Sequence, residues 1–180
     1  MPNSYTEQEQ LLIVLFQALV NDIRYSNNFI FGLLKEVTLS KKVIVDIDGA
    51  RLELSASDND QYTLHINSVD ALAHASFISK GDYLREVVAG TITLDHAISS
   101  NKILLKGALE DLLGIYRLVV GLLVEGPTSP HLRALWDSFD KNWPQTVPLG
   151  MLIDLDVQQV SDYFTDLDVN AEIKNVEITY

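Results

Sequence analysis

Apolar residues in this chain recur at two spacings, one typical of helices and one typical of strands. Near the N-terminus, apolar side chains return every three or four residues, which predicts one buried face of a helix. Ser4 or Thr6 can cap that helix, and the acidic residues that follow suit its positive end. The apolar positions of this face are Leu12, Leu15, Phe16, Leu19 and Ile23.

Alternation of apolar and polar residues then predicts strands at 43–47, 51–55 and 62–66. Asp48-Gly49 joins the first two as a type I′ turn, which is the connection that two-residue hairpins favour. A fourth strand is expected within 73–79. Between the first helix and these strands, the stretch 21–32 is rich in helix-breaking residues and carries an aromatic patch.

The second half of the chain returns mainly to helical spacing. A helix is expected at 81–88, closed by Gly90, and then a short helix, a strand at 102–106 and a long helix at 108–124. Gly126-Pro127 ends that helix. An amphipathic helix is expected from about Pro130 to Asn142, because proline suits the first turn of a helix.

The long helix at 108–124 is apolar on nearly every side. Such a helix must be buried on several sides, so it either packs deep in a core or walls an apolar cavity. Gly114 and Gly121 lie on one side of it, where they permit close approach of a ligand or of another element. The choice between core and cavity decides the function.

Composition and charge narrow the classes of function. The 180 residues carry a formal net charge of −12, which disfavours binding to nucleic acid and to anionic lipid surfaces. There is no cysteine, so a disulfide framework and a thiolate nucleophile are excluded. The longest apolar runs fall far below the roughly 18 residues that indicate a transmembrane helix. We therefore expect a soluble, cytoplasmic protein without a transmembrane segment.

No motif in the chain indicates catalysis or a metal site. The four histidines, at 65, 74, 96 and 131, show no metal-binding helical spacing. Asp46-Ile-Asp48-Gly49 lacks the third oxygen ligand that a calcium loop needs before its glycine, and a hairpin explains it better. Asp82 and Glu86 share a helix face, where a solvated edge with Arg85 is expected. We expect no enzyme, no cofactor and no metal.

Short motifs at 62–66, 75–79, 82–90, 95–98, 102–107 and 109–123 resemble, in this order, the sterol carrier protein 2 (SCP2) family. They include Asp82-Tyr-Leu-Arg-Glu-Val-Val-Ala-Gly and Lys102-Ile-Leu-Leu-Lys-Gly. The resemblance covers roughly residues 39–124. This chain has Asn101 where the family often has glycine, and Ala108 where the family often has an acidic residue.

The resemblance implies an α+β fold in which helices cover one face of a five-stranded, mostly antiparallel sheet. It also implies an apolar tunnel between sheet and helices that holds a fatty acyl chain, a sterol or an isoprenoid lipid without catalysis. For any single lining residue, packing in an ordinary core is the simpler explanation. The expected lipid-binding residues are Leu12, Leu15, Phe16, Leu19, Phe77, Ile103, Leu109, Leu112, Leu113, Tyr116, Val119, Val120 and Leu123.

We expect residues 1–143 to form the SCP2-like domain with an added C-terminal helix, and residues 144–180 to form an acidic extension. Apolar spacing within this extension predicts that it folds back on the domain or docks on a second copy or a partner protein. Two other functions stay open. One is an accessory protein that presents a lipid or quinone intermediate to a partner enzyme, docking through the extension or the helix with Trp136 and Trp143. The other is an interaction module with no pocket.

Overall fold

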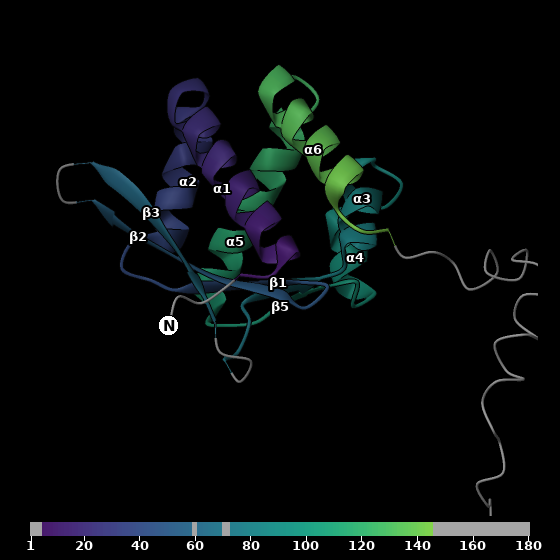
Figure 1. The fold of residues 1–180 in the computed structure, drawn as a ribbon, viewed down its shortest axis with the longest axis horizontal. Helices are drawn as coiled ribbons and strands as arrows, with labels where there is room; N and C mark the ends of the chain where they lie inside the picture. Colours follow the sequence, from purple (N-terminus) through teal and green to yellow (C-terminus); the bar gives the residue numbers. More distant parts are fainter. Residues whose placement is uncertain (1–4, 59–60, 70–72, 146–180) are drawn as a thin grey trace, which may run out of the picture. The chain divides into compact units, whose positions relative to one another are not determined.

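A five-stranded sheet lies at the base of the fold, and helices rise from one side of it (Figure 1). The structure is a computed structural model, and it describes residues 5–58, 61–69 and 73–145. The strands are β1 (Val43–Ile47), β2 (Ala50–Asp58), β3 (Tyr62–Ser68), β4 (Phe77–Ser79) and β5 (Ile103–Leu105). The helices are α1 (Glu7–Ser26), α2 (Asn28–Thr38), α3 (Gly81–Val88), α4 (Leu94–Ser99), α5 (Leu109–Glu125) and α6 (Pro130–Asn142). The predicted α+β class, with a five-stranded sheet covered by helices, is confirmed.

The sheet is mixed, with the strand order β3-β2-β1-β4-β5. Three of its four pairings are antiparallel, and the pairing of β1 with β4 is parallel. Buried and less buried residues alternate along β1, so Val43, Val45 and Ile47 share the face that the helices cover. This face forms one wall of the protein interior.

The β1–β2 hairpin has the tight turn that its sequence predicts. Asp48 and Gly49 have φ values of 51° and 85°, and Ile47 pairs with Ala50 across the turn. Positive φ at both central residues is the signature of a type I′ turn. The Asp46 carboxylate accepts a hydrogen bond from the Gly49 N–H at 3.0 Å, which adds a local constraint on the turn.

Helix α1 begins with a reciprocal cap. The Glu9 N–H donates to the Thr6 hydroxyl at 3.2 Å, and the Thr6 N–H donates to the Glu9 carboxylate at 2.8 Å. This capping box satisfies two N–H groups that would otherwise have no partner at the helix start. Thr6, one of the two predicted caps, is therefore the N-cap of α1.

Helix α2 occupies part of the stretch that the sequence marked only as rich in breakers. Asn27 ends α1 and begins α2, because its N–H donates to the Ile23 carbonyl and its side chain accepts from the Ile30 N–H at 3.0 Å. An asparagine that breaks one helix thus caps the next. The signal was present, since apolar residues at 30, 33, 34 and 37 have helical spacing.

Two other predicted boundaries shift. Strand β4 contains only Phe77–Ser79, where pairing was expected from residue 73. Asn101, which stands where glycine was expected in the resemblance, has a φ of 59°. Asparagine is among the few residues that tolerate this left-handed conformation, so the turn forms without glycine. The expected extension at 144–180 lies outside the described residues, apart from Pro144 and Gln145.

Candidate functional site

An apolar cavity of about 220 Å³ lies between the sheet and helices α1, α2, α3, α5 and α6. All five strands of the sheet contribute to its lining, and it is partly open to solvent. An engineered cavity of about 150 Å³ in another protein stays dry and binds benzene, so this volume is enough for a small apolar molecule. The interior of the fold is therefore not fully packed.

The lining of this cavity offers little to a polar ligand. No charged side chain is part of it, and Thr38 is its one hydroxyl-bearing residue. The Thr38 hydroxyl donates to the Leu34 carbonyl at 2.7 Å and lies 2.9 Å from the Tyr62 hydroxyl. Burial is the main cause that raises the pKa of Tyr62, so this phenol stays neutral at physiological pH. The cavity suits a hydrocarbon group.

Eight of the thirteen residues expected to bind a lipid line the cavity. They come from four elements that are far apart in the sequence, which the fold brings together around one space. Helix α1 supplies the largest share, because the apolar face predicted for it points inward. These eight residues are Leu12, Leu15, Phe16, Leu19, Phe77, Ile103, Val119 and Leu123.

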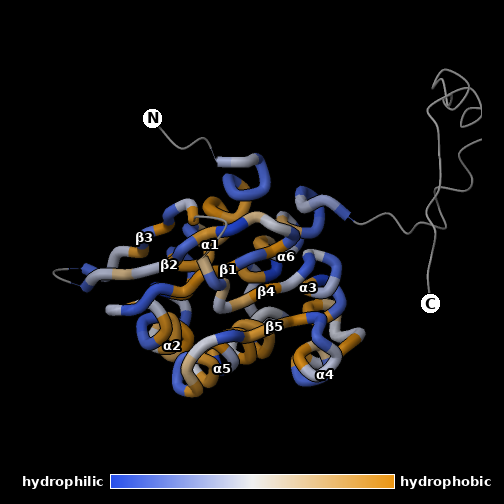
Figure 2. The backbone as a smooth tube through the Cα atoms, turned by 90° about the horizontal axis from the view of Figure 1, so that it is seen from below, coloured by the Kyte–Doolittle hydropathy of each residue, from blue (hydrophilic) through white to orange (hydrophobic). Residues whose placement is uncertain are grey.

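The other five expected residues lie outside the lining, so the structure does not bring them to this cavity. Leu109 and Leu113 are exposed at 71% and 50%, and the Tyr116 hydroxyl donates to the Asp95 carboxylate at 2.8 Å. Leu112 and Val120 are half-buried but do not reach the cavity. Helix α5 is largely hydrophobic along its length (Figure 2), yet only one of its faces meets the cavity.

The helical period explains this difference. Ile115, Leu118 and Leu122 recur three and four residues apart and line the cavity, so they mark the inner face of α5. Leu109, Leu113 and Val124 project from the opposite face, and all three are exposed. A helix that looked apolar on every side is thus buried on fewer sides than its composition predicts.

The two glycines of α5 make room for another helix. A Cβ atom on Gly114 would lie 3.2 Å from the Val37 side chain, and one on Gly121 would lie 3.4 Å from Ile30. Val37 and Ile30 both belong to α2, which packs along α5. Of the two explanations left open for these glycines, close helix packing applies.

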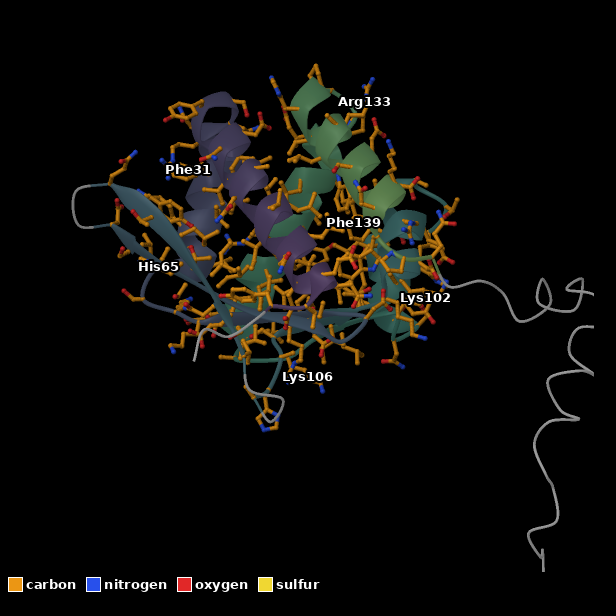
Figure 3. All side chains as sticks on the ribbon, viewed as in Figure 1. Phe31, His65, Lys102, Lys106, Arg133 and Phe139 are labelled. Carbon is orange, nitrogen blue, oxygen red and sulfur yellow. The ribbon has the colours of Figure 1, made fainter. Side chains whose placement is uncertain are left out.

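Helix α6 also lines the cavity, although the sequence analysis did not place it there. Leu132, Leu135, Trp136 and Phe139 contribute to the lining. Figure 3 shows Phe139 on the inner side of α6. The amphipathic pattern at 130–142 predicted a buried face but did not show what that face covers, because contacts between distant segments leave no local signal.

The end of α6 is held by a group of contacts that we call the Trp143 clamp, formed by Asp48, Gly81, Arg85 and Trp143. The Asp48 carboxylate accepts from the Trp143 indole N–H at 2.9 Å and from the Gly81 N–H at 2.8 Å. Arg85 donates to the Trp143 carbonyl at 2.6 Å and to the Asp140 carboxylate at 2.7 Å. Trp143 is 2% exposed, so it is not available for the partner docking considered above.

The acidic residues weighed as candidate sites serve structural roles here. Asp46 and Asp48 bind backbone or indole N–H groups of the protein itself. Asp82 pairs with Arg85 at 2.7 Å as expected, whereas Glu86 pairs with Lys102 at 2.5 Å. Within the described residues, no group of three or more His, Cys, Asp or Glu side chains is arranged to hold a metal ion.

The chain matches no family model, no curated protein and no solved structure. The resemblance to the SCP2 family therefore rests on the short motifs alone. Among the described helices, none is by itself long and apolar enough to cross a membrane. Helices α5 and α6 reach that length and hydropathy only as a pair, and they meet at 103°.

Proposed function

We propose that this protein binds or carries a hydrophobic ligand in the cavity between its sheet and its helices, without catalysing a reaction. The single observation that carries the proposal is the apolar cavity of about 220 Å³. Most cores are packed to the density of organic crystals, with few voids larger than a water molecule. A void of this size, lined almost entirely by hydrocarbon, is expected where a ligand occupies it.

The volume sets the size of that ligand. A group the size of water occupies about 30 Å³, so the 220 Å³ cavity holds about seven methylene-sized groups. Each buried CH₂ contributes about 0.8 kcal/mol, which gives about 6 kcal/mol before the cost of association. Because association itself costs about 4 kcal/mol or more, this burial alone leaves an eight-carbon chain weakly bound. A longer acyl chain or an isoprenoid would continue through the open side of the cavity, and a sterol would require the helices to move apart.

This proposal agrees with the function that the SCP2 resemblance implies, namely binding of a fatty acyl, sterol or isoprenoid lipid. The accessory role of presenting a lipid or quinone to a partner enzyme uses the same cavity and is the second candidate. Of the docking surfaces expected for this role, Trp143 is buried in the clamp, and the extension beyond residue 145 lies outside the described residues. A cytoplasmic location stays a prediction.

A chain-length series of primary alcohols, from butanol to dodecanol, tests the proposal by calorimetry. Affinity should rise about fourfold per added CH₂, which corresponds to about 0.8 kcal/mol. The increase should level off near seven or eight carbons, where the cavity is full. Absence of binding at every length, or an increase that continues to dodecanol with no change of slope, would contradict a cavity of this size as the binding site.

A further inference from the structure

The two edges of the sheet, β3 and β5, differ in how well they are protected from pairing with another chain. Strand β5 contains only Ile103–Leu105, is flanked by Lys102 and Lys106, and packs against α4. Short length, neighbouring lysines and a covering helix are three ways in which proteins prevent an edge strand from accepting a further strand. The β5 edge is therefore closed.

Strand β3 is long and uncharged instead. It pairs with β2 over its full length, Tyr62–Ser68, in an unbroken register, so it contains no bulge. Its sequence, Tyr-Thr-Leu-His-Ile-Asn-Ser, has no charged residue, no proline and no glycine. On its other side, β3 has no neighbouring strand among the described residues (Figure 2). A regular, uncharged edge of this length is a template for pairing with another strand.

The backbone of β3 has hydrogen-bonding groups available on its open side. In an antiparallel ladder, alternate residues direct both the N–H and the C=O away from the neighbouring strand. Arg24 donates to the Tyr62 carbonyl at 2.6 Å, and no other side chain of the described residues bonds to the backbone of residues 62–67. Most of the backbone groups that β3 turns away from β2 can therefore bond to a further strand.

The apolar side chains of β3 also leave surface to bury. Leu64 and Ile66 lie on the face that the helices cover, yet both are only half-buried. Leu54, which lies opposite Ile66 on β2, is 5% exposed. Leu64 also lines the apolar cavity. A strand added at this edge would continue the apolar face and remove both side chains from water, which favours the addition.

We propose that two copies of this chain pair through β3 in antiparallel orientation, which joins their sheets into one continuous sheet. Because alternate residues point outward, the two-fold axis between the copies passes through a residue, and His65 (Figure 3) is the centre that pairs the whole strand. Leu64 of one copy then lies opposite Ile66 of the other, and Thr63 lies opposite Asn67. The pairing forms about six to eight backbone hydrogen bonds.

Charge favours this edge as the place where two copies meet. Each copy carries a net charge of −12, so contact between most of their surfaces is opposed by repulsion. Residues 61–69 carry no charge, so no like charges face each other across the paired strands. A two-fold interface of one surface with itself is also the commonest form of homodimer. This inference does not depend on the proposed function.

Cysteine cross-linking tests the pairing and its register, because the chain contains no cysteine of its own. His65→Cys places the two Cα atoms about 4.5–5.5 Å apart, within the range that a disulfide spans. Thr63→Cys is the matched control on the same strand, because its two Cα atoms lie about 13 Å apart, four residues along the ladder. Under mild oxidation of the full chain, His65→Cys should give a covalent dimer and Thr63→Cys almost none.

Sedimentation equilibrium of the full chain tests the same interface without cross-links. An edge-strand interface is small, so a monomer–dimer equilibrium is expected at concentrations up to about 0.5 mM. His65→Lys places two lysines opposite each other and should weaken the dimer about tenfold. Ala134→Lys makes a similar change of charge at an exposed position of α6 and should not weaken it. Melting temperatures measured at low concentration show whether both variants fold.

The outcomes decide for or against this edge. A chain that stays monomeric at every concentration leaves β3 to a strand of another protein or to solvent, and overturns the proposal. Equal disulfide yields from His65→Cys and Thr63→Cys would reveal random collisions or another register, and would also overturn it. A dimer that His65→Lys does not weaken uses a different surface. If His65→Lys fails to fold, the two cysteine variants decide alone.

Discussion

The apolar cavity and the Trp143 clamp both involve α6, but they are packed in opposite ways. In the cavity, large side chains such as Phe16 and Phe139 surround an empty volume of about 220 Å³. In the clamp, a methyl group on Gly81 would lie only 2.3 Å from the Trp143 ring. Because the Trp143 clamp has no room for even one added methyl group, the cavity is a specific feature of the fold and not a sign of a generally loose core.

The two regions also differ in their polar contacts, which are numerous in the clamp and nearly absent from the cavity. The Asp48 side chain, from the β1–β2 turn, and the Arg85 side chain, from α3, both bind Trp143, which fixes the end of α6. The cavity has a single hydroxyl-bearing residue, Thr38, and that hydroxyl is already engaged. The clamp holds one end of α6, so α6 can cover the cavity while it stays attached to the rest of the fold.

The largest expected effect is on the unfolding free energy, which should fall more when a leucine is removed from the packed core than when one is removed from the cavity lining. Leu52 is 0% exposed and lies away from the cavity, whereas Leu12 is 2% exposed and lines it. Leu52→Ala should cost about 3–5 kcal/mol of unfolding free energy, because it removes a fully surrounded side chain. Leu12→Ala should cost about 1–2 kcal/mol less, since one side of Leu12 has no contacts to lose. Urea titration of both variants measures the difference, and equal losses would contradict the void.

A second prediction concerns the tightness of the clamp. Gly81→Ala should lower the unfolding free energy by about 2–4 kcal/mol, because the new methyl group displaces Trp143 and breaks its bond to Asp48. Gly32→Ala is the matched control: a Cβ there meets no atom within 4 Å in the interior of α2. It should raise stability by about 0.5–1 kcal/mol through helix propensity. Thermal unfolding measures the stability of both variants. A shift of the melting temperature in the same direction and by the same amount in both would contradict the tight packing of the clamp.

The smallest expected effect is a pH dependence from Tyr62 at the edge of the cavity. Burial raises the pKa of Tyr62 in the folded state, so the folded protein holds this proton more tightly than the unfolded chain. The resulting stability is present below the unfolded pKa near 10 and is lost as pH rises through the folded value. Tyr62→Phe should cost about 1 kcal/mol at neutral pH and show a flatter loss above pH ~10. Denaturant titrations of the unmodified protein and of Tyr62→Phe, at neutral and at high pH, measure this difference. An equal loss of unfolding free energy in both proteins between the two pH values would contradict the prediction.

Local patterns predicted most elements of the fold, because caps, turns and periodicity act over a few residues. Thr6, Asp48-Gly49 and Pro130 all mark boundaries where the structure has them. Helix α2 was missed because Asn27 carries one signal that ends a helix and another that begins one.

The cavity was harder to predict than the elements. Its lining comes from five helices and all five strands, so no single segment encodes it. For α5, the sequence could not show which apolar face turns inward, and Leu109 and Val120, expected at the ligand, do not line the cavity. Trp143 was considered as part of a docking helix, and its burial could not be predicted because its partners Asp48 and Arg85 lie 95 and 58 positions away in the sequence.

The most direct test of the central claim measures octanol binding to two neighbouring variants of α5. Val119 lines the cavity, whereas Val120 packs against the core from outside it. Val119→Trp should fill the cavity and abolish measurable octanol binding. Its loss of unfolding free energy should be smaller than the roughly 1–3 kcal/mol that overpacking costs in a closed core, because the cavity already has room for the larger side chain. Val120→Trp should leave octanol affinity unchanged within about twofold, because its side chain does not enter the cavity. Octanol binding that survives Val119→Trp, or that is lost equally in both variants, would contradict the claim that this cavity is the ligand site.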